Sequence, residues 1–416
     1  MDELVATNEI WDFVDKHIGD DVAALGLAGG KKFGLDDDEM RFALVQIEAR
    51  QKLGRKLGRM TARRGVIFPQ RLSWEQCSSE ATAAYKFREI AKLVDGSFDC
   101  GVDLTGGLGV DAMAMADVCK TVDYVEMNDE LCKVAEVNFH LMGYDNIKIH
   151  NMTAEAFVDK CVQDGRKFDL IYLDPARRGA NGEKVYRLEE CSPDVRAMCG
   201  SLQKIGDLVM VKMSPLISVS DCRISDKGGL QNVLCIGTDG ECKEVVTVEY
   251  LNPVKIEHDL LKIKCVEIER SGKYAEFEFM DSDERKLLWD VLGFDGLRNM
   301  KWIYEPSPVM MKTCGWRTIA RQYGVKMIGM NAHLYASSYE IKNFPGRRFK
   351  MTNVLEFNRK DIAKMFGEIG GKANITVRNF KMSVEDIRKK FRVRDGGDKY
   401  LFFCTDDDGR KIVVLC

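Results

Sequence analysis

The sequence predicts an α/β protein with a parallel, doubly wound sheet, preceded by a helical domain and followed by an α+β region. Two observations predict the sheet. Apolar runs of strand length alternate with stretches of helix length from residue 98 onward, and a glycine-rich turn follows the first of these runs. Strands separated by helices are expected to be parallel, because a parallel pair needs a long crossover connection. Such sheets bind ligands outside the carboxyl ends of their strands, so the chemistry is expected there.

Four regions are expected along the chain. Residues 1–95 have apolar positions at helical spacing, as in "DDDEMRFALVQIEARQKLGRKLG", and predict a helical N-terminal domain. Residues 96–262 contain the alternating strands and helices of the sheet. Residues 263–345 and 346–416 form the α+β region, and the last of these stretches predicts a strand, a capped helix and a two-stranded hairpin.

The composition indicates an ordinary soluble globular protein. Of the 416 residues, 45% are hydrophobic and 31% are charged, and a net charge of -3 favours no particular class of partner. The fourteen cysteines are scattered without a CxxC pair, which fits a reducing compartment. The N-terminus is acidic, unlike a signal peptide, and no apolar run approaches the ~18 residues that span a bilayer. We expect a cytoplasmic protein without a metal site, since the five histidines show no metal-ligand spacing.

A glycine-rich turn joins the first strand to the next helix in "GVDLTGGLGVDAMAMA". Gly107, Gly109 and Ala112 satisfy the GxGxxA pattern with which dinucleotide-binding proteins hold a pyrophosphate, and Glu126 lies at the predicted end of the next strand. An oxidoreductase that uses NAD or FAD therefore stays open. Asp103 argues against it, because a carboxylate ahead of the glycines repels a pyrophosphate. The same carboxylate suits S-adenosylmethionine (SAM), which carries an ammonium and a sulfonium but no phosphate.

The spacing is coherent for SAM. Asp103 and the glycine turn would contact its methionine part, Glu126 would accept hydrogen bonds from the ribose hydroxyls, and Met127 would offer an apolar face to adenine. Thr153 and Ala154, after the third strand, would flank the edge of the base. A segment ahead of the sheet, "CSSEATAAYK", is placed to close over the methionine end, with a plain helix cap as the alternative. The expected cofactor contacts are Asp103, Thr105, Gly106, Gly107, Gly109, Glu126, Met127, Thr153, Ala154 and Ser79.

The stretches "DLTGGLGVD", "YVEMND" and "DLIYLDPARR", in this order and spacing, resemble the class I SAM-dependent methyltransferases. More narrowly, "LSWEQCSSEATAAYK" ahead of the sheet and "FPGRRF", "TVRNF" and "IRKKF" near the C-terminus resemble a group of bacterial methyltransferases. That group ends in a ferredoxin-like segment and a THUMP-like domain. The resemblance covers most of the chain. It implies a Rossmann-like class I methyltransferase sheet, SAM as cofactor, and RNA, often tRNA, as the partner of the THUMP-like domain.

The fourth strand ends in "FDLIYLDPARRG". Methyltransferases of exocyclic base amines resemble one another in an Asp/Asn-Pro-Pro-aromatic loop here, where the acid and a main-chain carbonyl accept the amine hydrogens. Asp174 and Pro175 match this loop, whereas Ala176 stands at the second proline and Arg177 replaces the aromatic residue. An arginine stacks on a base or binds a phosphate, and its charge keeps Asp174 ionised. The alternative is an ion pair of Asp174 with Arg177 or Arg178 that only caps the strand.

Two stretches of the chain are basic. Residues 50–72 hold eight Lys or Arg and no acid, and residues 372–394 hold eight against two acids. We expect both to hold RNA phosphates on either side of the catalytic cleft, which positions a substrate without reading its sequence. A solvated helix face is the alternative for the first stretch. The residues expected to bind substrate are Arg178, Arg55, Lys56, Arg59, Arg378 and Lys381.

The sequence thus predicts a SAM-dependent methyltransferase acting on a base of structured RNA, tRNA or rRNA. Methylation of a ring carbon needs a nucleophilic cysteine, and none lies in or beside "DPARR". Three alternatives stay open: a protein or small-molecule methyltransferase, an RNA-binding protein whose SAM site is vestigial or regulatory, and the oxidoreductase. The sequence predicts no oligomeric state.

Overall fold

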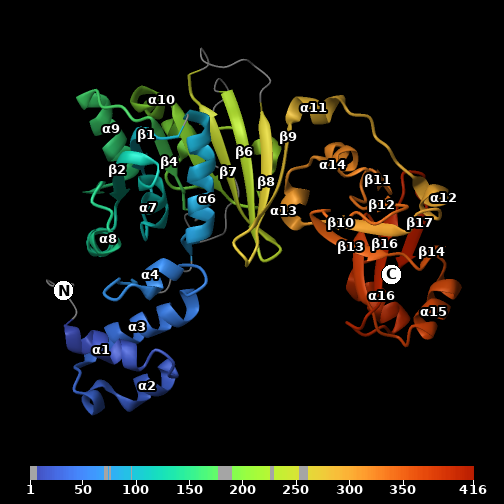
Figure 1. Ribbon diagram of the computed structural model, residues 1–416, viewed down its shortest axis with the longest axis horizontal. Coiled ribbons are helices and arrows are strands. Elements are labelled where there is room, and N and C mark those ends of the chain that lie inside the picture. The colour runs from blue at the N-terminus through green and yellow to red at the C-terminus, as the bar shows by residue number, and fades with distance from the viewer. Residues whose placement is uncertain are drawn as a thin grey trace. The chain divides into compact units, whose positions relative to one another are not determined.

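The computed structural model describes residues 7–69, 74, 76–94, 96–176, 190–224, 229–252 and 261–416. The chain forms two compact units, whose elements are labelled in Figure 1. The first unit comprises Met1–Leu234 and Glu244–His258, and the second comprises Cys235–Lys243 and Asp259–Cys416.

The first unit begins with the helices that the sequence predicts. The longest of them starts at a capping box, in which the side chain of Asp36 accepts hydrogen bonds from the N–H groups of Asp38 and Glu39. The elements are α1 (Asn8–Lys16), α2 (Val22–Ala28), η1 (Gly30–Phe33), α3 (Asp37–Leu53), α4 (Gly58–Ala62), α6 (Glu80–Ala91) and η2 (Lys92–Val94).

A sheet follows, whose strands that lie wholly or partly in the first unit have the order β3-β2-β1-β4-β5-β7-β6. Five strands are parallel, as predicted: β1 (Phe98–Asp103), β2 (Cys119–Glu126), β3 (Ile147–Asn151), β4 (Leu170–Leu173) and β5 (Leu208–Met213). β6 (Gly229–Thr238), which the sequence did not predict, and β7 (Glu241–Tyr250) break this pattern, because β7 pairs antiparallel with β5. A turn through Asp239 and Gly240, both with positive φ, joins β6 to β7 and leaves no room for a crossover.

Helices connect the parallel strands: α7 (Val110–Ala116), α8 (Asp129–Met142), α9 (Ala154–Asp164) and α10 (Val195–Ile205), with a turn η4 (Val219–Asp221) after β5. α8 ends at Gly143, which adopts the left-handed conformation that favours glycine. All four residues of β4 are buried, so this strand lies inside the core of the sheet. The parallel strands bring the carboxyl ends of β1, β2, β4 and β5 to one edge.

From residue 259 onward the second unit contains a hairpin of β8 (Lys262–Ile268) and β9 (Tyr274–Met280). The helix α11 (Asp281–Lys286) follows β9 and ends where Leu287 turns extended, at ψ 143. The exposed side chains of Leu288 and Trp289 explain why the helix ends there, because no core holds that stretch as a helix.

Two four-stranded sheets make up the rest of this unit, with the orders β11-β12-β10-β13 and β14-β17-β16-β15. The first contains β10 (Trp302–Pro306), β11 (Lys326–Met327), β12 (Tyr335–Ser337) and β13 (Gly346–Lys350), with α12 (Gly293–Leu297), α13 (Pro308–Lys312) and α14 (Trp316–Tyr323). The second contains β14 (Asn353–Glu356), β15 (Asn374–Arg378), β16 (Tyr400–Thr405) and β17 (Lys411–Leu415), with α15 (Arg359–Glu368) and α16 (Val384–Phe391). Ser383 caps α16 and a hairpin joins β16 to β17, as predicted.

Candidate active site

The glycine turn lies between β1 and α7, where the sequence predicts it. Gly107 and Gly109 have positive φ angles of 53° and 82°, which favour glycine. Gly106 is required for another reason: a Cβ atom there would lie 2.2 Å from the ring of Tyr124. The N–H of Gly107 donates to Oε2 of Glu126 at 2.9 Å, so the turn is fastened to the end of β2.

Asp103 ends β1 beneath this turn and is fully buried. Its Oδ1 accepts a hydrogen bond from the N–H of Thr105 at 3.0 Å, while Oδ2 has no hydrogen-bond partner among the described residues. Burial, reinforced by the neighbouring charge of Asp111, raises the pKa of Asp103 to about 8. An unpartnered buried acceptor of this kind is poised for a ligand that brings a cation or an N–H group.

Glu126 ends β2, as the sequence predicts, and Met127 follows it. Oε1 of Glu126 accepts a hydrogen bond from the N–H of Asn128 at 2.8 Å, and Met127 is 72% exposed and free to face a ligand. The hydroxyl of Thr153 caps α9, because it accepts a hydrogen bond from the N–H of Ala156. Ala154 is buried at the start of that helix. Thr153 and Ala154 thus lie after β3 as expected, and the hydroxyl of Thr153 serves as the N-cap of α9.

Asp174 follows β4 and is tied to the glycine turn. Its N–H donates to Oγ1 of Thr105 at 2.6 Å, which joins the segments after β1 and β4. The carboxylate is 30% exposed and forms an ion pair with Lys212 of β5 through Oδ2. Burial raises the pKa of Asp174, against the opposing effect of Lys212. Pro175 is buried, and Ala176 pairs with Ser192 through two main-chain hydrogen bonds of 2.8 and 3.0 Å.

Arg177 and Arg178 lie outside the described residues. The predicted ion pair between one of them and Asp174 therefore stays a prediction, as does their contact with a base or phosphate. The cation that the described residues place on Asp174 is Lys212, which the sequence did not single out.

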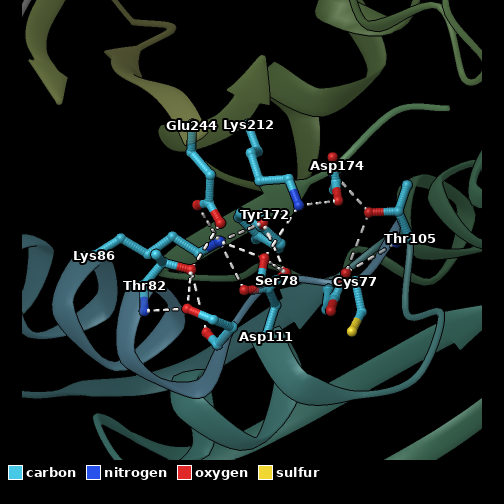
Figure 2. A network of polar contacts seen from close by, with 12 residues as sticks. Cys77, Ser78, Thr82, Lys86, Thr105, Asp111, Tyr172, Asp174, Lys212 and Glu244 are labelled. Atoms are coloured by element: carbon cyan, nitrogen blue, oxygen red, sulfur yellow. Dashed lines mark hydrogen bonds and ion pairs between the residues drawn. The ribbon is translucent and has the colours of Figure 1, made fainter. Parts of the chain in front are cut away.

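A buried polar cluster extends from this ion pair (Figure 2). Nζ of Lys212 and Nζ of Lys86 both donate to Oγ of Ser78, each at 3.1 Å. Ser78 in turn donates to Asp111 at 2.8 Å, and Lys86 forms ion pairs with Asp111 at 2.7 Å and Glu244 at 3.1 Å. We call this set the lysine cluster; its members are Ser78, Thr82, Lys86, Asp111, Tyr172, Asp174, Lys212 and Glu244.

Sequence reasoning missed most of the lysine cluster. A lysine inside the apolar strand "LVMVKM" is the signal that would have found Lys212, because a buried ammonium needs a partner. Ser79, which was expected near SAM, caps α6 by accepting a hydrogen bond from the N–H of Thr82 at 3.0 Å. It therefore holds the helix that carries Lys86, next to Ser78 of the cluster.

In the first basic stretch, residues 50–72, several cationic side chains contact other residues of the chain. Arg50 lies over the rings of Trp11 and Phe68 and donates to a main-chain carbonyl at 2.7 Å, and burial lowers its pKa to about 10. Lys56 donates to the carbonyl of Trp74 at 3.2 Å, and Arg59 donates to the hydroxyl of Tyr144 at 3.3 Å. Both contacts tie the two side chains to the fold. Arg55 is exposed.

In the second basic stretch, Arg378 and Lys381 differ. Arg378 forms an ion pair of 2.8 Å with the buried carboxylate of Glu305, which Arg347 also contacts. Lys381 is exposed, as are Lys389 and others of α16 and its flanks. Lys381 is therefore the better placed of the two to meet a phosphate.

Among the described residues, no group of three or more His, Cys, Asp or Glu is placed to hold a metal ion. Within the same residues, no helix combines the length and the apolar character needed to cross a membrane.

Two family models match the C-terminal part of the chain: a ferredoxin-like domain over residues 302–345 and a THUMP domain-like model over residues 346–416. The crystal structure of a candidate methyltransferase from Porphyromonas gingivalis W83 is similar over 98% of this chain and 96% of that chain. The two share 26% sequence identity with a TM-score of 0.78.

Curated relatives match shorter parts. An uncharacterized RNA methyltransferase from Enterococcus faecalis is 27% identical over 146 residues, which are 35% of this chain and 29% of that protein. A 23S rRNA (uracil(1939)-C(5))-methyltransferase from Aliivibrio salmonicida is 38% identical over 84 residues, which are 20% of this chain and 19% of that protein. The chain thus spans less than a third of the length of either relative. The chain is therefore similar in fold, over nearly its whole length, to a candidate methyltransferase, and its C-terminal part matches a ferredoxin-like and a THUMP domain-like model.

Proposed function

We propose that this chain transfers a methyl group from SAM to a nucleotide of structured RNA, tRNA or rRNA. The observation that carries the proposal is the carboxylate of Asp103, buried at the end of β1 with Oδ2 unpartnered among the described residues. The ammonium of SAM would supply the missing hydrogen bond and the positive charge that favours ionised Asp103.

The surrounding residues fit the same cofactor. Gly106 is crowded by the ring of Tyr124, so a side chain at this position would displace the turn that is proposed to hold the cofactor. Each oxygen of Glu126 accepts one main-chain hydrogen bond and retains a lone pair for a ribose hydroxyl. Met127 offers an apolar surface to adenine. When bound, SAM would supply an electrophilic methyl group, and Asp174 would orient the accepting group toward it.

RNA is the substrate class that the C-terminal domains support. The THUMP domain-like match and the relatives named RNA methyltransferase both support RNA as the substrate. The exposed cations around α16 would hold phosphates by their charge. With RNA as substrate, we place the protein in the cytoplasm.

We propose that the RNA atom that receives the methyl group is a nitrogen or an oxygen rather than a ring carbon. Carbon methylation, as in the name of the Aliivibrio relative, uses a thiolate nucleophile. Cys77, which lies beside Ser78 of the lysine cluster, donates to the carbonyl of Trp74 at 3.2 Å, and burial raises the pKa of its thiol to about 11. A protonated thiol is a weak nucleophile. The sequence favours a base amine oriented by Asp174 and the carbonyl of Pro175.

Calorimetry with SAM, S-adenosylhomocysteine and NADH tests the cofactor. We expect both SAM compounds to bind and NADH not to bind; binding of NADH without SAM would support the oxidoreductase instead. Incubation with methyl-labelled SAM and total RNA from a strain that lacks the gene tests the substrate. Label in protein or small molecules, with RNA unlabelled, would contradict the RNA assignment.

A further inference from the structure

The lysine cluster places the buried ammonium group of Lys212 in contact with Asp174, and a second buried ammonium group, that of Lys86, is linked to Lys212 through Ser78 (Figure 2). Lys86 is fully buried and Lys212 is 8% exposed, whereas the carboxylate of Asp174 that Lys212 contacts is 30% exposed. A group that docks on Asp174 from solvent would therefore meet a carboxylate and, one hydrogen bond behind it, an ammonium.

The stability of the fold does not require the buried ion pairs of the lysine cluster. Removing an ion from water costs several kcal/mol, and an apolar residue of similar volume is often as stabilising as a buried ion pair. The neighbours of Lys212 in β5, Val211 and Met213, are buried apolar residues, so the strand accepts such a side chain. A buried lysine at this position of β5 therefore indicates a role in the reaction rather than in stability.

Resting on the proposed function, we propose that the atom methylated is the 2′-hydroxyl oxygen of an RNA ribose, with Asp174 accepting its proton and Lys212 stabilising the negative charge that develops on that oxygen. Lys86, Ser78 and Glu244 hold Lys212 in place and act as positioning residues.

The sign of the developing charge decides between an amine and a hydroxyl. An amine nitrogen becomes positive as it attacks a methyl group, so an ammonium nearby opposes the reaction. A hydroxyl oxygen becomes a good nucleophile as it loses its proton and turns negative, and a preorganised cation then stabilises it. Lys212 keeps its charge, because the pKa of its ammonium, which burial alone would lower, is raised by Asp174, Glu244 and Asp111.

The step balances without a further reactant. The hydroxyl oxygen forms a bond to the methyl carbon while the bond from that carbon to the sulfonium sulfur breaks, and its electron pair stays on the sulfur. The hydroxyl proton passes to the carboxylate of Asp174. Burial raises the pKa of that carboxylate above its usual range, toward that of an effective base.

The location of the methyl group tests this proposal. The full-length chain would be incubated with methyl-labelled SAM and total RNA from a strain that lacks the gene, and the nucleosides would be fragmented by mass spectrometry into base and ribose. We expect the label on ribose, together with resistance of the adjoining phosphodiester to alkali. Label on the base would overturn the hydroxyl proposal and leave the proposed function intact. No label in any RNA would overturn both.

Substitution of Lys212 tests its role. Lys212→Met should lower kcat by about 100-fold or more. The acidic limb of the pH–rate profile should also move to higher pH, because loss of the cation raises the pKa of Asp174. SAM affinity, measured by calorimetry, should stay unchanged and shows that the variant folds.

A matched control is Lys120→Met, since Lys120 forms an exposed ion pair with Asp99. It should keep full activity. Lys212→Arg retains the cation and should keep more activity than Lys212→Met. A Lys212→Met enzyme with normal kcat and an unmoved pH profile would refute the role of Lys212.

Discussion

A Cβ atom on Gly106 would lie 2.2 Å from Cε2 of Tyr124, and the hydroxyl of Tyr124 donates a hydrogen bond to the carbonyl of Gly107 at 2.6 Å. The tyrosine of β2 therefore both restricts and supports the glycine turn after β1. Because the ring is buried in the sheet, it has no room to retreat from an added side chain.

Gly106→Ala should disturb the turn on which the proposed cofactor site depends. Overpacking typically costs about 1–3 kcal/mol, so we expect a lower melting temperature and a SAM dissociation constant raised by about tenfold or more. Thermal denaturation and calorimetry measure the two effects. Gly200→Ala is the control, because Gly200 lies within α10 and a Cβ atom there meets nothing within 4 Å. An alanine at position 106 that binds SAM normally would contradict the assigned site.

The protonation of Asp103 should make both stability and SAM binding depend on pH. Burial raises the folded-state pKa to about 8 from 3.8, so the folded protein binds this proton more tightly than the unfolded chain. Its contribution to stability is complete below about pH 4 and is lost as the pH rises through about 8, by up to about 1.4 kcal/mol per unit. Conversely, SAM should bind more tightly as the pH rises through about 8, since its ammonium prefers ionised Asp103.

Asp103→Asn checks both effects, because the amide keeps the shape and the acceptor for Thr105 while it removes the titration. Denaturant unfolding and SAM calorimetry at several pH values should show flatter profiles in the variant than in the parent protein. Parallel profiles in the two proteins would mean that another group titrates.

The exposed cations of the second basic stretch should bind RNA. Lys381→Glu combined with Lys389→Glu should flatten the slope of log affinity against log salt by about 0.7–0.9 for each phosphate that the variant no longer neutralises. Filter binding at several salt concentrations measures the slope. Lys273→Glu, an exposed lysine of the β8–β9 turn, is the control and should leave it unchanged. Equal slopes in all three proteins would show that Lys381 and Lys389 do not contact RNA phosphates.

Arg378 should behave as a structural residue. Glu305 is buried, and Arg378→Met would leave it with Arg347 as its remaining ion-pair partner among the described residues. We expect the free energy of unfolding to fall by about 1–3 kcal/mol, with the salt slope of RNA binding unchanged. A flattened slope with normal stability would show instead that Arg378 contacts phosphate, as the sequence predicts.

Patterns that depend on local geometry were predictable from the sequence. The five parallel strands are visible as apolar runs, and Gly143 and Ser383 mark helix ends because few residues satisfy those positions. β6 was missed because it opens with "GLQN", which carries no strand pattern.

Features that depend on partners distant in sequence were not predictable. Lys86 and Glu244 are 158 positions apart, yet they form one ion pair. Likewise, the basic run of residues 50–72 does not reveal that Arg64 is paired with Asp12 and Asp15, or that Arg50 lies between two aromatic rings. Charge in a sequence therefore indicates a phosphate surface only after the internal partners are known.

Methyl transfer to RNA is tested most sharply by comparing the parent protein with Asp174→Ala, using methyl-labelled SAM. We expect labelled RNA with the parent protein and a reduction of about 100-fold or more with Asp174→Ala, at unchanged SAM affinity. Undiminished transfer by Asp174→Ala, or no transfer to RNA by a parent protein that binds SAM, would contradict the proposed function.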